Sequence, residues 1–305
     1  MSTGVEATAP RPIDPLAPAR PTYVDDLVEV MSTVGTLPRR TLRTVRTEHF
    51  DISHQGHVVR VAHRVPLGQV HTGLSELLSR EVFGPGWLRG ADVFERIVTG
   101  IVLTSAEDPL DAWEHYYRTS LREIEAAVSL GDSPAAGLHG AIAGYAPVYA
   151  HAEGQLVGES LLELGSSFGF FSLRQASTRT VTAIDVSPGS VRLLERVSAR
   201  LGTPVETHVA DAAHVPLPDG CADSVVALHL LEHVEPGHGW RIIDEAIRLA
   251  RKRVIIAVPY EDVPEELWGH VRTLDSEDLR AYGQRTALPF SVQEQHGGWL
   301  VIDVD

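Results

Sequence analysis

Two acidic residues and the glycine-containing loop between them are the positions of this chain best suited to bind a small molecule. Glu163 ends a short apolar run, the loop Gly165–Gly169 follows, and Asp185 ends a second apolar run, Val181–Ile184. This order predicts strand, tight turn, helix, strand and acid, the layout of a nucleotide-type cofactor site at the carboxyl edge of a parallel sheet. A carboxylate at the second strand's end can accept hydrogen bonds from two vicinal ribose hydroxyls.

A dinucleotide fits this loop poorly. Its pyrophosphate requires glycines at the first, third and sixth loop positions. Here those positions hold Gly165, Ser167 and Phe170. Phe170 would also crowd the contact between helix and strand, so an NAD-dependent oxidoreductase is a disfavoured alternative.

The same segment resembles the first motif of the class I methyltransferases, which use S-adenosyl-L-methionine. That motif is an acid followed by glycines at alternate positions. Glu163, Gly165 and Gly169 match it, whereas Ser167 replaces the middle glycine. Serine is small enough to let the methionine tail of this cofactor approach the loop.

Later segments continue the resemblance in order. Asp185 has the place of the ribose-binding acid, and a third predicted strand ends at Asp211-Ala212, where the family brackets the adenine. A fourth predicted strand runs into His229–Val234, which is similar to the LEHV segment of ubiquinone-type small-molecule methyltransferases. The resemblance implies these cofactor-binding residues: Glu163, Gly165, Ser166, Ser167, Gly169, Phe170, Asp185, Val186, Asp211, Ala212 and His229.

Three histidines are candidates for acid–base chemistry. Methyl transfer to an alcohol benefits from a positioned base, and histidine suits that role near neutral pH. We expect His233 or His229 to be the base, because His229 leaves the fourth strand at its carboxyl end, and His270 to assist on the substrate side. The alternative for each is a histidine that only hydrogen-bonds the backbone.

The segment His229–His233 also matches the H-x-x-E-H zinc motif of inverted metalloproteases. That motif belongs inside a helix and needs a distant third ligand, whereas this one is predicted to straddle a strand end, which disfavours a protease. Our main prediction includes no metal. Glu232 with His233 is the alternative site for a hard cation such as Mg2+, as the resemblance to ubiquinone-type enzymes allows.

Charge and composition restrict the partners and the compartment. The formal net charge is 26 − 41 = −15, so nucleic acid is a poor substrate. Cys221 is the only cysteine, which rules out an intrachain disulfide and suits a reducing compartment. The first residues do not resemble a signal peptide, and no apolar run approaches membrane-spanning length. We expect a cytoplasmic protein that acts away from membranes.

We predict an α/β fold: a Rossmann-like, seven-stranded class I methyltransferase sheet within residues 138–305. Gly297-Gly298 indicates that an antiparallel hairpin closes the sheet. Residues 21–137 are expected to form an N-terminal accessory α+β region that caps the substrate side, after a disordered tail, 1–20. Within that region the patterns predict a hairpin around Gly56, with strands 41–50 and 57–65, and helices 74–82 and 111–128.

The acceptor is the least constrained part of the function. As a whole the chain is similar to the actinobacterial mycofactocin oligosaccharide methyltransferases, which implies O-methylation of a glucose hydroxyl on a small-molecule glycoside. A quinone, polyketide or other lipid-like acceptor and a non-catalytic cofactor-binding module are alternatives. Trp113 is expected in the core, and a platform for a sugar or apolar ring, formed by Trp113 or Trp87, is the lesser alternative.

Overall fold

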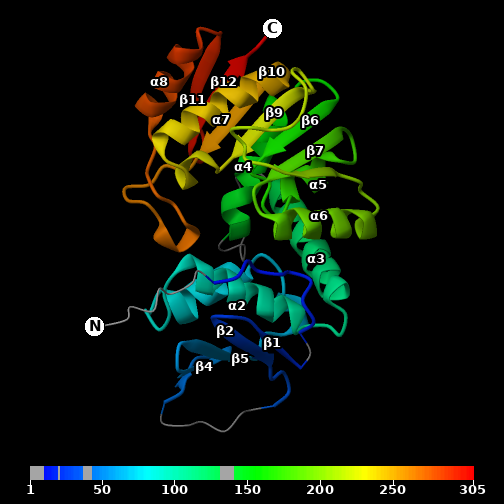
Figure 1. The fold of residues 1–305 in the computed structure, drawn as a ribbon, viewed down its shortest axis with the longest axis vertical. Coiled ribbons are helices and arrows are strands. Elements are labelled where there is room, and N and C mark those ends of the chain that lie inside the picture. Colours follow the sequence, from blue (N-terminus) through cyan, green and yellow to red (C-terminus); the bar gives the residue numbers. More distant parts are fainter. Residues whose placement is uncertain (1–9, 20, 37–42, 131–140) are drawn as a thin grey trace, which may run out of the picture.

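The computed structural model describes residues 10–19, 21–36, 43–130 and 141–305, with side chains in the last range from residue 145 onward. The chain forms two sheets that lie toward opposite ends of the molecule (Figure 1). The N-terminal sheet has five strands in the order β1-β2-β5-β4-β3, and the C-terminal sheet has seven in the order β11-β12-β10-β9-β6-β7-β8.

The seven-stranded sheet carries the predicted cofactor loop. Its five central and edge strands β6 to β10 are parallel, and the hairpin β11–β12 closes the sheet antiparallel to β10. This confirms the predicted Rossmann-like sheet and its closing hairpin. The strands are β6 (Ser160–Leu164), β7 (Thr180–Asp185), β8 (Glu206–Val209), β9 (Ala222–Leu228), β10 (Ala250–Val258), β11 (Phe290–Glu294) and β12 (Gly298–Asp303).

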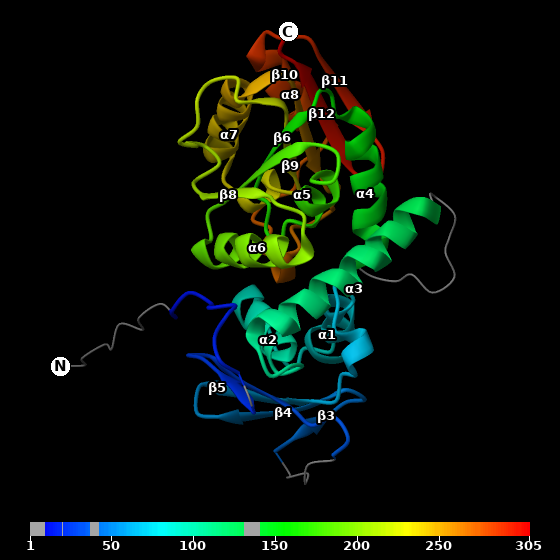
Figure 2. The same ribbon diagram turned by 90° about the vertical axis from the view of Figure 1, so that its right-hand side faces the viewer.

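Helices cover both faces of this sheet because its strands are apolar on both sides. Leu161 belongs to a core cluster with α4, α5 and α6, whereas its neighbour Leu162 belongs to a second cluster with α7 and α8 (Figure 2). Helix α6 has Ser187 as its N-cap and Gly202 as its C-cap. The helices are α4 (Ala141–Gln155), α5 (Phe170–Gln175), α6 (Pro188–Leu201), α7 (Pro236–Leu249) and α8 (Ser276–Thr286), with short 3-10 turns η3 (Leu231–His233) and η4 (Glu266–Trp268).

The N-terminal sheet contains the predicted hairpin around Gly56, but its first strand is shifted. Strand β4 begins at Phe50, where the predicted strand 41–50 ends; residues 41 and 42 lie outside the described residues. The predicted helix 74–82 is α1, continued by the π-type turn η2. Helix α2 was not predicted. The elements are β1 (Thr22–Val24), β2 (Val28–Ser32), β3 (Val45–Arg46), β4 (Phe50–Gln55), β5 (Val58–His63), η1 (Leu67–Gln69), α1 (Leu74–Leu78), η2 (Ser79–Phe83) and α2 (Ala91–Leu103).

Helix α3 (Pro109–Leu130), predicted as 111–128, connects the two parts. Trp113 and Tyr117 are buried on α3, and both rings contact Phe168 of the cofactor loop. The largest apolar cluster is continuous from the N-terminal sheet through α2 and α3 to α5 and α6. The N-terminal part therefore packs directly against the C-terminal part (Figure 2).

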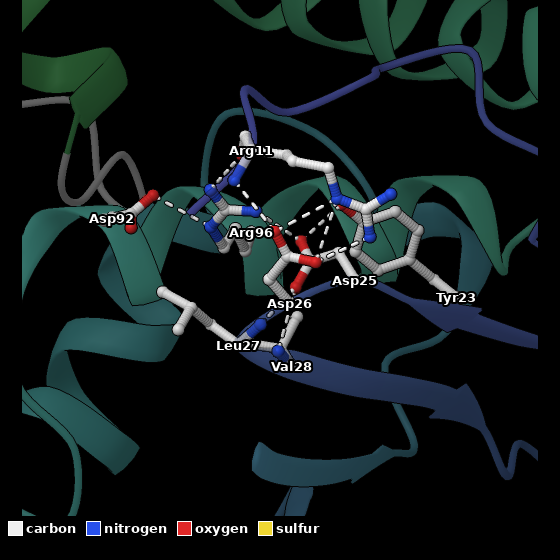
Figure 3. A network of polar contacts seen from close by, with 8 residues as sticks. All are labelled: Arg11, Tyr23, Asp25, Asp26, Leu27, Val28, Asp92 and Arg96. Atoms are coloured by element: carbon white, nitrogen blue, oxygen red, sulfur yellow. Dashed lines mark hydrogen bonds and ion pairs between the residues drawn. The ribbon is translucent and has the colours of Figure 1, made fainter. Parts of the chain in front are cut away.

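A polar network ties the start of the chain to the accessory part. The buried Arg96 of α2 donates to Asp25, to Asp92 and to the carbonyl oxygen of Arg11 (Figure 3). The segment 10–19, which the sequence places in a tail, has no helix or strand, yet Ala19 is buried within it. Residues 1–9 and the predicted boundary at 137–138 lie outside the described residues.

Candidate functional site

The cofactor loop turns sharply after β6. Gly165 and Gly169 have φ of 72° and 68°, and Ser167 also lies in the left-handed region with φ of 49°. A Cβ at Gly165 would come within 2.8 Å of Leu230, and one at Gly169 within 2.5 Å of Leu194. Both positions therefore require glycine for space as well as conformation.

Ser167 occupies a conformation that favours glycine, and a hydrogen bond compensates for it. Its backbone N–H donates to Asp185 Oδ2 at 2.8 Å. The other oxygen, Oδ1, accepts from the N–H of Ser187 at 2.8 Å. Asp185 thus fixes the loops after β6 and β7 together, and each of its oxygens keeps a lone pair that can accept from a ribose hydroxyl.

The carboxylate of Glu163 is hydrogen-bonded within the chain. It is buried and accepts from the N–H of Ser172 at 3.0 Å and from its Oγ at 2.5 Å. Burial raises the pKa of Glu163 to about 7, although both bonds from Ser172 oppose the rise. Its visible role is to hold the start of α5 against β6; contact with the cofactor stays a prediction.

The other predicted cofactor residues lie along the same sheet edge. Val186 is 72% exposed just after β7, whereas Phe170 and Ala212 are buried. Ser166 donates its N–H to the carbonyl of Ile184. Asp211 accepts from the N–H of Ala213 and pairs with His238, a partner that the sequence did not single out.

The structure brings the three predicted histidines together. His229 follows the carboxyl end of β9 with a left-handed φ of 53°, a strained conformation of the kind found at functional sites. His233 lies in η3, and its ring meets the ring of His270 edge to face, with centroids 4.9 Å apart. Nδ1 of His233 is 3.3 Å from the carbonyl oxygen of Gly269, and Nδ1 of His270 is 2.8 Å from Glu261 Oε2.

The ionisation of these groups is shaped by burial. Burial, assisted by the neighbouring His270 and His233, lowers the pKa of His229 to about 4, so its ring is neutral at pH 7. Its Nε2 has no hydrogen-bond partner among the described residues. Beside it lies Glu232, which is only 1% exposed, and burial raises the pKa of this carboxyl to about 8. Within the described ranges neither carboxylate oxygen of Glu232 has a partner.

The motif His229–His233 spans a strand end and a 3-10 turn. A zinc protease would need it inside a helix, so the disfavoured protease alternative lacks its helix. Two residues of the site were missed. Glu261 follows β10 after a proline, and Tyr145 of α4 places its ring 6.2 Å from that of His229; neither carries a local sequence pattern.

The accessory part reaches the same edge through α2. Phe94 packs edge to face on Trp268 of η4, with ring centroids 5.1 Å apart. The pKa of Glu95 is raised by burial, then by the charge of Asp92, and the charge of Asp185 adds to the rise, which places this carboxyl near Asp185. Trp113 is 1% exposed, and its Nε1–H donates to the carbonyl oxygen of Pro15. It is therefore a core residue, as the sequence predicted.

Two solved structures are similar to part of this chain. An S-adenosylmethionine-dependent methyltransferase from Aquifex aeolicus is similar over 59% of this chain and 96% of its own, at 18% identity and a TM-score of 0.42. One from Methanosarcina mazei covers 50% of this chain and 95% of its own, at 19% identity and a TM-score of 0.43. None of the described helices is long and apolar enough to cross a membrane.

Sequence comparison points to the same class. Residues 162–258 match the family model described as a methyltransferase domain. Ajmaline N-methyltransferase of Rauvolfia serpentina is 28% identical over 103 residues, which are 32% of this chain and 35% of that protein. The chain thus spans about a third of the length of this curated relative. Residues 162–258 are thus similar to a methyltransferase domain, and the cofactor that this similarity implies is S-adenosyl-L-methionine.

Proposed function

We propose that this protein is an S-adenosylmethionine-dependent O-methyltransferase that acts on a small molecule or glycoside. One observation carries the proposal: the cofactor loop and the histidine segment are in contact. The space at Gly165 is bounded by Leu230, the residue that follows His229. A methyl group presented from this loop would therefore face the three histidines.

The residues divide the work of methyl transfer. The loop Gly165–Gly169 and Asp185 would hold the methionine tail and the ribose. When bound, the cofactor would supply an electrophilic methyl group for transfer to an acceptor oxygen, with its sulfur as the leaving group. The acceptor's hydroxyl proton passes to an imidazole of the histidine cluster. The base that we propose is His233 or His229, and His270 assists on the substrate side.

The acceptor that we propose is a glucose hydroxyl of the mycofactocin oligosaccharide. Its support is the resemblance of the whole chain together with a polar site. Histidine and carboxylate groups such as Glu261 can hydrogen-bond sugar hydroxyls, and Trp268, 40% exposed, offers a ring face for stacking. The net charge of −15 supports the exclusion of nucleic acid. Work in the cytoplasm, away from membranes, is part of the same proposal.

A second candidate acceptor is lipid-like, such as a quinone or polyketide. The segment after β10 exposes apolar side chains beside the histidines: Val263 is 70% exposed and Val271 53%. Such residues could receive an apolar ring or chain.

Two measurements test the proposal. Calorimetric titration should show binding of S-adenosylhomocysteine and none of NAD; NAD binding alone would refute the cofactor assignment. The protein is then incubated with isotopically labelled methyl donor and with separate oligosaccharide and lipid extracts, and products are read by mass spectrometry. Label in glucose-containing oligosaccharide is expected. Label in lipid supports the second acceptor. No label despite cofactor binding would make the chain a non-catalytic binding module.

A further inference from the structure

Glu232 is a buried acid whose carboxylate has no visible purpose in the fold. Its side chain is 1% exposed, and neither oxygen has a hydrogen-bond partner among the described residues. The Nδ1 atom of the neutral His229 ring is 3.8 Å from Oε1 of Glu232, beyond hydrogen-bond distance. A buried acid without a partner is costly, so its carboxylate is expected to meet a ligand that the chain itself does not supply.

Two histidines converge on the same point. One ligand atom each from Glu232, His233 and His270 can be chosen so that all three lie within 4.8 Å of one another. This is close to the spacing around a bound cation, since ligand bonds of about 2.0–2.2 Å place opposite ligands at most about 4.4 Å apart. Only a small adjustment of side chains separates this cluster from a coordination site.

The outer contacts of both imidazoles match those of metal ligands. Nδ1 of His270 pairs with Glu261 at 2.8 Å, and Nδ1 of His233 lies 3.3 Å from the carbonyl of Gly269. A metal-binding histidine characteristically donates its second N–H to a carboxylate or a backbone carbonyl, which fixes the tautomer. In both rings this leaves Nε2 as the lone-pair donor.

The two segments that carry these side chains are fixed to each other by the backbone. The N–H of Val271 donates to the carbonyl of Glu232 at 2.9 Å. The Arg272 guanidinium donates to the carbonyl of Leu231 at 3.0 Å. The positions of Glu232 and His270 are thus set by the fold before any ligand arrives, as preorganised coordination requires.

We propose that Glu232, His233 and His270 bind one divalent cation, with Glu261 orienting His270. Two imidazoles and one carboxylate suit a borderline cation such as Zn2+ or Co2+ better than Mg2+, which prefers all-oxygen ligands. Three protein ligands leave coordination positions open for an acceptor hydroxyl. The inference rests on the proposed function for the role of the cation, and it assigns His233 and His270 as ligands, which leaves His229 as the histidine free to take the proton.

A second cluster of possible metal ligands, on the accessory part, has a carboxylate that is already hydrogen-bonded within the chain. Glu48, His49 and Glu81 also have ligand atoms close together. Glu81, however, already accepts from the Thr47 hydroxyl and the His49 backbone, and its other oxygen pairs with His49 Nδ1. Its carboxylate is used by the fold, in contrast to that of Glu232.

Cobalt binding tests the site without relying on activity. Untagged, full-length protein is stripped with EDTA, dialysed and titrated with Co2+, and the visible absorption bands and the bound cobalt per chain are measured. We expect one Co2+ per chain, displaced by Zn2+. Glu232→Gln, which is nearly isosteric, should weaken binding at least about tenfold, as should His270→Ala. His208→Ala, which removes a surface histidine paired with Glu206, should bind as the wild type does.

The outcomes separate this proposal from the proposed function. Folding of each variant is checked by circular dichroism, and S-adenosylhomocysteine binding is measured on the same samples. Cobalt binding that is absent, or equal in wild type and in folded Glu232→Gln, would overturn the cation site even if the cofactor binds. Cobalt binding that depends on Glu232, without any cofactor binding, would support the cation site and reject the methyltransferase function.

Discussion

Asp185 links two loops, so its carboxylate has more than one task. It holds the N–H of Ser167 and the N–H of Ser187, one on each oxygen. The first of these bonds supports a serine in a left-handed conformation. Loss of the carboxylate should therefore disturb the cofactor loop as well as remove the proposed acceptor for the ribose.

Asp185→Ala is expected to weaken S-adenosylhomocysteine binding by about 1–3 kcal/mol, because the ribose hydroxyls of the bound ligand would lose their acceptor. Asp185→Asn keeps one acceptor oxygen and should have a smaller effect. Calorimetric titration of both variants measures the difference. Wild-type affinity in the alanine variant would show that the ribose binds elsewhere.

Glu163 predicts a pH dependence of stability. Its pKa is about 7 in the folded chain, raised mainly by burial, against 4.5 for an ordinary glutamate. The folded state therefore holds this proton more tightly than the unfolded state, and its contribution to stability is lost as pH rises from about 4.5 to about 7. At about 1.4 kcal/mol per pKa unit, the loss is about 3 kcal/mol.

Glu163→Gln cannot lose a proton and should escape this decline. Urea denaturation without cofactor at pH 5 and pH 8 is the measurement, and the variant should gain on the wild type by up to about 3 kcal/mol at the higher pH. Ser172→Ala removes both the hydroxyl bond and its opposition to the pKa rise, so it should move the decline to higher pH. An equal difference between Gln variant and wild type at both pH values would contradict the assignment.

At this scale the sequence predicted the turn after β6 and the acid that ends β7, because an acid at a strand end and glycines in a tight turn are local requirements. The hydrogen-bond partners of these residues were harder to predict from the sequence. Glu163 matched the motif, yet its hydrogen bonds to Ser172 depend on how α5 packs on β6. Glu261 became visible only when the fold brought it to His270.

At the scale of elements, helix α3 is closely packed but buries one hydroxyl, that of Tyr117, whose lost hydrogen bonds to water reduce the stability of the fold. The side chain of Tyr117 is fully buried among aromatic rings, and its hydroxyl has no hydrogen-bond partner among the described residues. Tyr23, equally buried on β1, donates its hydroxyl to Asp25 at 2.8 Å. These two tyrosines form a matched pair.

Tyr117→Phe should stabilise the protein by about 1 kcal/mol, because it removes an unsatisfied buried hydroxyl. Tyr23→Phe should destabilise it by about 1 kcal/mol, because a made hydrogen bond is lost. Urea denaturation of both variants gives the two signs. Destabilisation by Tyr117→Phe as large as that by Tyr23→Phe would mean that the Tyr117 hydroxyl has a partner.

The elements of the C-terminal part could be predicted because each carries its own apolar run and its own cap. The accessory part was harder. Strand β4 begins at Phe50 rather than nine residues earlier, since β3 and its turn interrupt the alternating pattern. Helix α2 buries one face against β2 and presents Phe94 to Trp268, so its apolar residues do not form the single narrow stripe that marks an exposed helix.

At the scale of the whole molecule, one apolar cluster joins the two sheets. It runs from Val28 and Val30 of β2 to Phe171 of α5 and Val197 of α6. Parts that share a continuous core cannot unfold separately without exposing it to water. We therefore expect the accessory part and the methyltransferase domain to unfold as one cooperative unit.

Substitution of two adjacent acids, Asp25 and Asp26, each paired with an arginine, tests this coupling. Asp25 pairs with Arg96, and the two side chains are only 14% and 3% exposed, whereas Asp26 pairs with Arg11, which is 81% exposed. Asp25→Ala leaves a buried guanidinium short of one partner and should cost about 3 kcal/mol, but Asp26→Ala should cost much less.

Hydrogen exchange followed by mass spectrometry shows how far the damage spreads. If the chain unfolds as one unit, Asp25→Ala should accelerate exchange by the same factor in peptides of β2 and in peptides of β10, which lies in the other sheet. Asp26→Ala should leave exchange in both sets of peptides nearly unchanged. The shared factor follows because both peptides would exchange through the same global opening, whose free energy the variant lowers. Acceleration confined to β2 would mean that the accessory part opens alone and that the common core does not couple the two sheets.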